Sequence, residues 1–306
     1  MERRSFLKAT GTALVSSTLA LPAVKSVRTE QLAKTEAAFK LQYAPHFGMF
    51  ENSAGEDILD QLKFMADQGF TAIEDNWFVR RPVEEQEAIS RELVRLNMRM
   101  GVFVAYFGRR EITLTSGDQE QVDGFIEQLK SCVEPAKRVN AKWMTVIPGD
   151  FHMRLDYDYQ MANVVEALKR GAEIFEPHGL VMVLEALNPL NHPDHFLKRI
   201  PQAYSICKAV NSPAVKILDD LYHQQITEGN LIPNMDMAWD EIAYFQIGDN
   251  PGRNEPTTGE INYKNVFKHI HDKGYTGILG MEHGNAMEGK EGEMALIAAY
   301  REVDSF

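Results

Sequence analysis

Oxygen-bearing side chains follow four successive apolar runs in the second half of the chain. Glu185 ends the run in "VLEAL", Asp219 and Asp220 follow "KIL", Gln246 follows "YF", and Glu282 lies in "GMEHG". A single acidic residue after a strand is more often a helix N-cap or a loop ion pair than a ligand. Four such positions in succession are harder to explain that way. Because carboxylates buried together are very unfavourable without a compensating cation or protons, the pattern predicts a bound divalent metal.

The type of ligand narrows the choice of metal. Carboxylate and amide oxygens favour Mg²⁺ or Mn²⁺, with Co²⁺ as a further candidate, over zinc or copper. The two cysteines, Cys132 and Cys207, form no C-x-x-C pair, so the sequence indicates neither a zinc knuckle nor a disulfide framework. We therefore interpret both as small buried hydrophobic residues.

Short apolar runs alternate with amphipathic stretches from residue 39 to the end. Eight runs predict strands: 39–45, 71–76, 100–107, 143–149, 181–187, 215–221, 242–248 and 277–283. Eight stretches predict helices: 58–69, 84–97, 122–140, 161–179, 195–211, 231–241, 263–274 and 291–303. Several of these helices end in Gly or Asn, the residues that favour a left-handed C-cap; examples are Gly69, Gly179, Asn211 and Gly274.

This alternation predicts an α/β fold with a parallel sheet. Eight βα units over residues 39–306 match a (β/α)8 TIM barrel, whose usual size is about 250 residues. A doubly wound open sheet is the alternative, but "YAPHFGMFEN" after the first strand is no G-x-G-x-x-G phosphate turn. Catalysis in such barrels takes place at the C-terminal ends of the strands, so we expect the four ligand positions to meet there.

The first residues form a different kind of segment. Residues 1–26, "MERRSFLKATGTALVSSTLALPAVKS", have the charged start, the short apolar run and the small-residue ending of an export signal. The hexamer "RRSFLK" resembles the twin-arginine signal, which predicts export of the folded protein to the periplasm or another extracytoplasmic space. A basic amphipathic helix or tail is the alternative interpretation. We expect residues 27–38 to be a linker and residues 39–306 to form a single catalytic domain.

The bulk properties limit the partners. The formal net charge is −12, whereas nucleic-acid binders need a dense basic face, so we expect no nucleic-acid partner. The apolar run near the start is too short to span a bilayer, and no cysteine near it could carry a lipid, so we expect no stable membrane anchor. Dimers and tetramers are common among barrels of this kind, and the sequence leaves open whether this chain forms a homo-oligomer.

Four segments together resemble a known family. Glu185 with Asn188, then "DLYHQQITEGNL", "QIGDNPGRNEPTTGEINY" and "GYTGILGMEHG" are similar to the hydroxypyruvate isomerase family. That family belongs to the xylose isomerase-like TIM-barrel superfamily, with ketose 3-epimerases and endonuclease IV as relatives. The resemblance extends over the chain after the signal, and its motifs are specific from residue 180 to 285.

The resemblance implies a role for each matching residue. As metal ligands it implies Glu185, Asp220, Gln246 and Glu282. It favours Asp220 over Asp219 because the family's D-x-x-H spacing ends at His223, and the alternation of side chains along a strand agrees. As substrate-binding residues it implies His223, Arg253, Glu255 and Asn188. The chain departs from the family at Asn254, where His is frequent, and at Ala186, where Pro is frequent, which leaves the exact substrate open.

The expected chemistry is isomerisation of a small hydroxy-carbonyl or sugar substrate. Glu185 and Glu282 would move the proton between neighbouring carbons through an enediolate, while also binding the metal. A sugar isomerase or 3-epimerase acting on free ketoses would need a larger pocket, shaped by the loops "FGRREITLTSGD" and "IPGDFHMRLDYDY". His192 and His195 are further places for divergence, or ordinary surface histidines.

Three other functions remain as alternatives. A lyase or hydrolase of oxidised sugars could use the same scaffold. A non-catalytic sugar-binding barrel would have no need of paired glutamates. An endonuclease would need a histidine-rich zinc cluster and a basic face, and here Gln246 replaces a nitrogen ligand.

Overall fold

The computed structural model describes residues 38–108 and 110–306. The predicted export signal at 1–26, and all but the last residue of the predicted linker at 27–38, lie outside them. Residues Phe39–Phe306 form one compact unit. Within the described part of the chain, no helix combines the length and the apolarity that a membrane crossing requires.

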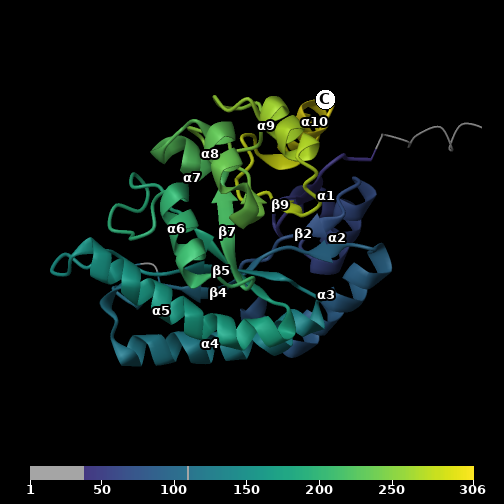
Figure 1. The fold of residues 1–306 in the computed structure, drawn as a ribbon. Helices are drawn as coiled ribbons and strands as arrows, with labels where there is room; N and C mark the ends of the chain where they lie inside the picture. Colours follow the sequence, from purple (N-terminus) through teal and green to yellow (C-terminus); the bar gives the residue numbers. More distant parts are fainter. Residues whose placement is uncertain (1–37, 109) are drawn as a thin grey trace, which may run out of the picture. The chain divides into compact units, whose positions relative to one another are not determined.

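Parallel strands form the centre of this unit (Figure 1). Seven of them make one sheet in the order β1-β9-β8-β7-β6-β5-β4, so the last strand in the chain pairs with the first. The strands are β1 (Gln42–Ala44), β2 (Ala72–Ile73), β3 (Arg99–Met100), β4 (Phe103–Phe107), β5 (Trp143–Ile147), β6 (Val181–Glu185), β7 (Val215–Asp220), β8 (Ile242–Gln246) and β9 (Ile278–Gly280). All eight predicted strands are present, and the third is divided into β3 and β4.

The segment after β2 closes the sheet into a barrel. Glu74 N donates a hydrogen bond to the carbonyl oxygen of Pro45 after β1, at 2.9 Å. On the other side, Val104 N in β4 donates to the carbonyl oxygen of Asn76, at 3.1 Å. The backbone of residues 74–76 therefore connects the two edges of the seven-stranded sheet, and the fold is the predicted (β/α)8 barrel.

Helices follow the strands and pack on the outside of the barrel. They are α1 (Glu51–Ala54), α2 (Ile58–Asp67), α3 (Val83–Leu96), α4 (Gln119–Arg138), α5 (Tyr157–Phe175), α6 (Ile200–Val210), α7 (Leu221–Thr227), α8 (Leu231–Ala238), α9 (Tyr263–Asp272) and α10 (Gly289–Val303). Short 3₁₀ helices occur at Phe78–Arg80, Leu114–Ser116, Glu176–His178 and Trp239–Glu241. The eight predicted helices are present, whereas α1 and α7 were not predicted. The helix predicted from residue 195 begins at Ile200, because residues 194–196 pair with the loop after β5.

The sequence explains these elements in physical terms. Every side chain of β5 and β6 is buried, since one face points into the barrel and the other meets the helices. These strands are therefore continuous apolar runs, in which polar and apolar residues do not alternate. The predicted C-caps Gly179 and Asn211 have left-handed φ values of 66° and 54°, which end their helices before the next strand.

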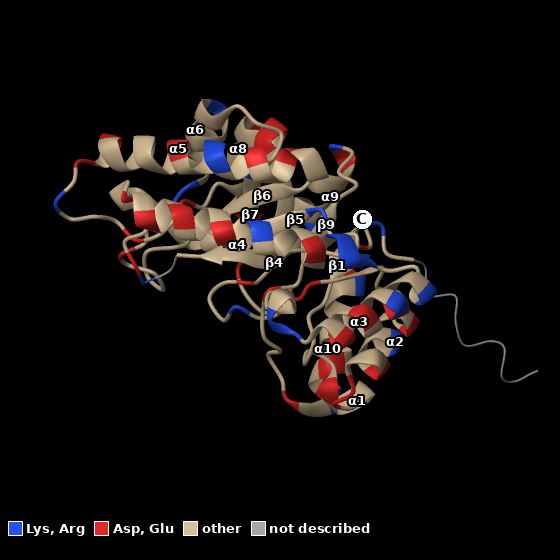
Figure 2. Ribbon diagram, turned by 90° about the horizontal axis from the view of Figure 1, so that it is seen from below, with Lys and Arg blue, Asp and Glu red and all other residues tan. Residues whose placement is uncertain are grey.

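Charged residues of both signs are interspersed on the outer helices α4 and α5 (Figure 2). Ion pairs three residues apart along the helices include Lys130–Glu127 and Lys169–Glu166, at 2.7 and 2.8 Å. Arg170 of α5 contacts Asp123 of α4 at 2.8 Å. Exposed pairs of this kind add little stability. Cys132 and Cys207 are buried free thiols, as predicted.

Candidate active site

The predicted ligand positions lie at the C-terminal ends of neighbouring strands. Glu185, Asp220 and Gln246 are the last residues of β6, β7 and β8, and Glu282 follows β9 by two residues. The register aligns Asp220 with Gln246 and Gln246 with Gly280, which places these ends at one level of the barrel. Glu185, Asp220 and Gln246 are 6%, 2% and 1% exposed.

The two consecutive aspartates of β7 have different surroundings. The Asp220 carboxylate lies 3.1 Å from the Arg253 guanidinium and 3.7 Å from the His223 ring. It also accepts hydrogen bonds from Tyr222 N and His223 N, so it caps α7. Asp219 is fully buried and, among the described residues, its carboxyl has no hydrogen-bond partner. Only Asp220 therefore joins the cluster of polar groups.

Arg253 connects two of the carboxylates. Its Nη2 donates to Asp220 Oδ2 at 3.1 Å and to Glu282 Oε2 at 2.7 Å, and the guanidinium lies 5.0 Å from the centre of the Tyr222 ring. The other oxygen of Glu282 accepts a hydrogen bond from Asn76 Nδ2 at 3.2 Å. The geometry fixes both oxygens of Glu282 and gives the carboxylates one positive neighbour.

The loop that carries Arg253 is built around a buried aspartate. Asp249 is fully buried, and its carboxylate accepts hydrogen bonds from Gly259 N at 2.8 Å and Ile261 N at 3.1 Å. Its carbonyl oxygen accepts one from Arg253 N at 2.7 Å, where the backbone has a left-handed φ of 50°. A Cβ at Gly259 would lie 2.1 Å from the carbonyl oxygen of Asn250, so only glycine fits this close approach. The charged, glycine-rich stretch is thus an ordered support for Arg253.

The hydrogen bonds of His223 determine which ring nitrogen carries the proton. Its Nδ1 accepts a hydrogen bond from Asn188 N at 3.3 Å, and the Asn188 side-chain amide lies 2.6 Å away. A backbone N–H can only donate, so the hydrogen of the neutral ring is on Nε2. Burial lowers the pKa of His223 to about 3, which keeps the ring neutral. Nε2 lies 3.6 Å from Glu185 Oε1, too far for a direct hydrogen bond but close enough to share a ligand.

Two predicted substrate-binding residues have their hydrogen bonds within the protein. Asn188 is fully buried; its amide nitrogen donates to Asn191, and its amide oxygen accepts from Leu190 N and Asn191 N. Glu255 is 3% exposed and accepts a hydrogen bond from Ala286 N at 2.8 Å, in the loop after β9. Asn188 therefore orients His223, and Glu255 joins two loops of the barrel mouth.

Another buried polar residue of the cluster, Glu74, was not predicted. It follows β2, is 2% exposed, and accepts hydrogen bonds from Gln246 Nε2 at 2.7 Å and Tyr244 Oη at 3.0 Å. A Cβ at Gly280 would lie 1.7 Å from its Oε2, so the glycine of β9 makes room for this carboxyl. The signal was present in "TAIEDN", where Glu74 follows an apolar run as Glu185 does.

Burial and mutual repulsion shift the protonation of these groups. Burial, followed by the charge of Glu282, raises the pKa of both Glu74 and Glu185 well above the ordinary range. Burial also raises the pKa of Glu282 to about 7, although Arg253 opposes this. For Asp220, burial is more than offset by His223, Arg253 and two backbone N–H groups, so its pKa lies below the ordinary value. The cluster therefore favours bound protons or a bound cation.

The residues fit a divalent cation. One donor atom each from Glu185, Asp220 and His223 lie within 4.8 Å of one another. Gln246 Oε1 is buried without a hydrogen-bond partner among the described residues, because only its amide nitrogen is used by Glu74. An orphaned buried carbonyl oxygen beside carboxylates is the arrangement that a hard cation satisfies. The hydrogen on His223 Nε2 makes that ring a donor to a ligand, so the four oxygen residues fit the metal better than His223 does.

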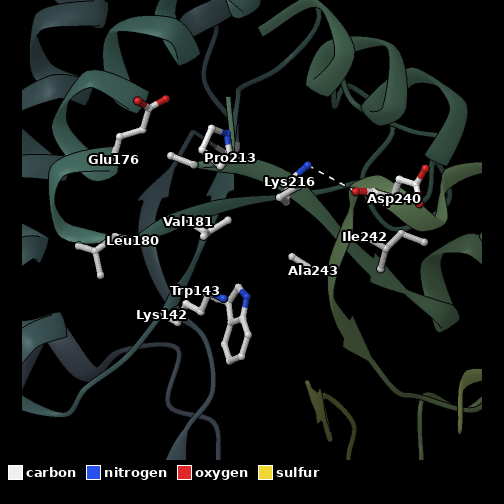
Figure 3. A pocket seen from close by; sticks show the side chains of 12 residues that line it. Lys142, Trp143, Glu176, Leu180, Val181, Pro213, Lys216, Asp240, Ile242 and Ala243 are labelled. Carbon is white, nitrogen blue, oxygen red and sulfur yellow. Dashed lines mark hydrogen bonds between the residues drawn. The ribbon is translucent and has the colours of Figure 1, made fainter. Parts of the chain in front are cut away.

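Three sizeable hollows lie at the opposite end of the barrel. They adjoin one another, have volumes of about 300, 370 and 420 Å³, and surround Lys142 and Trp143 near the starts of the strands. In the first of them, Lys216 donates to the carbonyl oxygen of Asp240 at 3.4 Å (Figure 3). This end holds aliphatic side chains and locally paired charges, whereas the buried carboxylates are at the other end, where barrel enzymes act.

Comparison with known proteins agrees with the barrel fold. Residues 62–301 match the model of the family described as xylose isomerase-like TIM barrel. A 2-oxo-tetronate isomerase from Pectobacterium atrosepticum is 27% identical over 74% of this chain and 86% of its own. A hydroxypyruvate isomerase from Escherichia coli is 29% identical over 74% of this chain and 88% of its own.

A solved structure is similar over the whole barrel. It is described as an AP endonuclease of family 2 from Brucella melitensis and is 25% identical, with a TM-score of 0.72. The match covers 85% of this chain and 99% of the other. The family match includes most of the described barrel and all the strands from β2 to β9. The chain therefore belongs to the xylose isomerase-like TIM barrel family.

Proposed function

We propose that the protein is a metal-dependent isomerase of a small hydroxy-carbonyl or sugar substrate, similar in activity to hydroxypyruvate isomerase. The observation that supports the proposal is the group of carboxyls formed by buried Glu185 and Asp220 and half-buried Glu282, beside the orphaned oxygen of Gln246. The isomerases of similar sequence support the reaction class.

The side chains suggest a division of roles. Glu185, Asp220, Gln246 and Glu282 would hold the cation. When bound, a divalent cation polarises a carbonyl oxygen and stabilises negative charge on the substrate. We propose Mg²⁺ or Mn²⁺, with Co²⁺ as a further candidate, because the ligand atoms are oxygens.

Proton transfer needs groups whose pKa lies near neutrality. In the metal-free site burial gives Glu282 a pKa of about 7 and also raises the pKa of Glu185. A bound cation would lower both pKa values, so that either carboxylate would be ionised and could accept a proton from carbon and return it to the neighbouring carbon. His223 Nε2–H would donate to a substrate oxygen, held in that direction by Asn188. Arg253 would bind a substrate oxygen or carboxylate on the far side. Glu74 and Glu255 would act as positioning residues through Gln246 and the loop after β9.

Isotope exchange tests this proposal. The metal-loaded protein, freed of residues 1–26, is incubated in D₂O with hydroxypyruvate, tartronate semialdehyde and several free ketoses, and C–H exchange is followed by NMR. We expect metal-dependent exchange next to the carbonyl of at least one compound. Exchange with hydroxypyruvate would support a hydroxypyruvate isomerase activity. Exchange only with longer ketoses would support a sugar isomerase or 3-epimerase. Bound metal without exchange of any compound contradicts the proposal and favours a lyase, a hydrolase or a binding protein.

We also propose that residues 1–26 direct export of the folded protein by the twin-arginine pathway, with residues 39–306 as the catalytic domain. The support is the "RRSFLK" hexamer and the short apolar run that follows it. Replacing Arg3 and Arg4 together by Lys should leave the full-length precursor inside the cell. Fractionation with mass analysis of the mature N-terminus measures this, and export of the double variant at the normal level would contradict it.

A further inference from the structure

A second, smaller cavity lies at the mouth of the barrel. It has a volume of about 200 Å³, and its polar lining comes from Arg110, Asp150, Asn191, His192, Asp194 and His195. We call it the distal pocket. Its volume corresponds to roughly seven water molecules at about 30 Å³ each, enough for several hydroxyl-bearing carbons. The proposed acid–base groups do not line it.

The wall of the distal pocket is held by backbone pairing. Phe151 N donates to the carbonyl oxygen of Asp194 at 2.7 Å, and Phe196 N donates to that of Gly149 at 3.1 Å. The loops after β5 and β6 thus form a short antiparallel bridge at Asp150 and His195. A pocket preformed in this way needs little ordering when a ligand binds.

The distal pocket is connected to the proposed catalytic residues. The His192 ring lies 5.4 Å from the His223 ring, centre to centre. Asn191 accepts hydrogen bonds from Tyr222 Oη at 3.1 Å and from Asn188 Nδ2 at 2.9 Å, and Asn188 in turn orients His223. A substrate bound beside His223 would therefore extend directly towards His192.

The charges of the lining select the chemistry of the ligand. The described residues of the lining include one guanidinium (Arg110), two carboxylates (Asp150 and Asp194) and the imidazoles of His192 and His195. The Asp150 carboxylate is 17% exposed and lies 3.9 Å from His195 Nδ1. Among the described residues, the lining offers donors and acceptors without an excess of positive charge. Such a lining suits hydroxyl groups, which both donate and accept, better than a carboxylate or an apolar group.

We propose that the distal pocket binds the hydroxyl-bearing chain of the substrate beyond the reacting carbons. The substrate is then a polyhydroxylated carbonyl compound of the sugar type, with more than three carbons. This inference rests on the proposed function, because the reacting carbons are assigned to Glu185 and Glu282. His192 and Asp150 act as specificity-determining residues, and the cation site does not require them.

Binding of unreactive polyols tests the distal pocket independently of turnover. Xylitol and glycerol are titrated against the Mn²⁺-loaded protein, freed of residues 1–26, and binding is followed by ligand-observed NMR. We expect xylitol to bind at least ten-fold more tightly than glycerol. In His192→Ala and Asp150→Asn this preference should fall to about three-fold or less, with Mn²⁺ binding unchanged. The matched controls are His178→Ala and Asp240→Asn, which change the same residue types away from the barrel mouth and should keep the preference.

The outcomes separate this inference from the proposed function. Two results would contradict the proposed role of the distal pocket, even if C–H exchange occurs. One is equal binding of xylitol and glycerol, and the other is a preference for xylitol that persists in both pocket variants. If the wild-type protein prefers xylitol and the pocket variants lose this preference, the distal pocket is supported, even when no tested ketose shows C–H exchange. In that case only the proposed isomerase activity is contradicted. If C–H exchange occurs, the same variants should lower kcat/KM for a five- or six-carbon ketose about ten-fold or more, and for hydroxypyruvate by less than about two-fold.

Discussion

The two ends of the barrel differ in what they bury. At the C-terminal ends of the strands, carboxyl groups are buried with a single arginine bridging two of them, and the pKa of most of these groups is raised. At the N-terminal ends there are sizeable hollows, yet their charges are paired locally; Glu241, for instance, accepts from both Lys208 and Lys216. The size of a hollow therefore does not locate the chemistry, whereas uncompensated buried charge does.

The difference has a structural origin. Both ends are built from the same strands, but β5, β6 and β8 leave the barrel into longer loops than those by which they enter it. The loop after β8 can therefore bring Arg253 back over Asp220 and Glu282, as the Asp249-centred turn shows. At the N-terminal end the turns from helix to strand are short, and the hollow there is lined by strand residues such as Trp143 and Ile242 together with residues of these turns, such as Leu180.

The largest expected contrast concerns catalysis. Glu185→Gln and Glu282→Gln should each lower turnover about 10²–10⁴-fold, because an amide cannot exchange a proton with carbon. Glu176→Gln, the same change at the N-terminal end, should leave turnover within about two-fold. Initial rates of C–H exchange measure this, with circular dichroism as the control for folding. Near-normal rates in both site variants would remove these residues from the proton transfer.

The next contrast concerns metal binding. Glu74→Leu removes the acceptor that holds Gln246 Nε2, so Gln246 Oε1 loses its fixed direction. Replacing a residue that orients a metal ligand typically lowers metal affinity about 10–100-fold. Titration with Mn²⁺, followed by electron paramagnetic resonance, measures the affinity. Glu241→Leu, which removes an acceptor at the other end of the barrel, should leave it unchanged, and equal affinities in the two variants would contradict the role of Glu74.

Most of the barrel and a large part of the proposed site could be predicted from the sequence. Continuous apolar runs and left-handed caps such as Asn211 identify the strands and helix ends, since both depend on local chemistry. Glu74 was missed because its partners, Gln246 and Tyr244, lie about 170 positions away and meet it only when the barrel closes. The supporting positions of Asn188 and Glu255 depend on loop hydrogen bonds, which residue types alone do not reveal.

A third contrast concerns pH. In the folded, metal-free protein Glu282 has a pKa of about 7, above the ordinary 4.5, so folding favours its protonated form. The stability from this group is therefore fully present below about pH 4.5 and is lost as the pH rises through about 7. We expect the Tm of the metal-free protein to fall by several degrees between pH 5 and pH 8 in calorimetry. In Glu282→Gln the fall should be smaller, and an equally steep fall in that variant would assign the effect to other groups.

The smallest expected effect is at the N-terminal end. Lys216 contacts Glu241 at 2.5 Å and is partly exposed, so its charge is compensated locally and screened by solvent. Lys216→Met should change the free energy of unfolding by about 1 kcal/mol or less and should leave turnover unchanged. Arg253→Met, at the other end, removes the guanidinium that contacts both Asp220 and Glu282, and should raise the Tm difference between metal-free and Mn²⁺-saturated protein. Because both substitutions remove one positive charge and keep a long apolar chain, a similar response to Mn²⁺ in the two variants would show that the buried carboxylates do not depend on Arg253 for compensation.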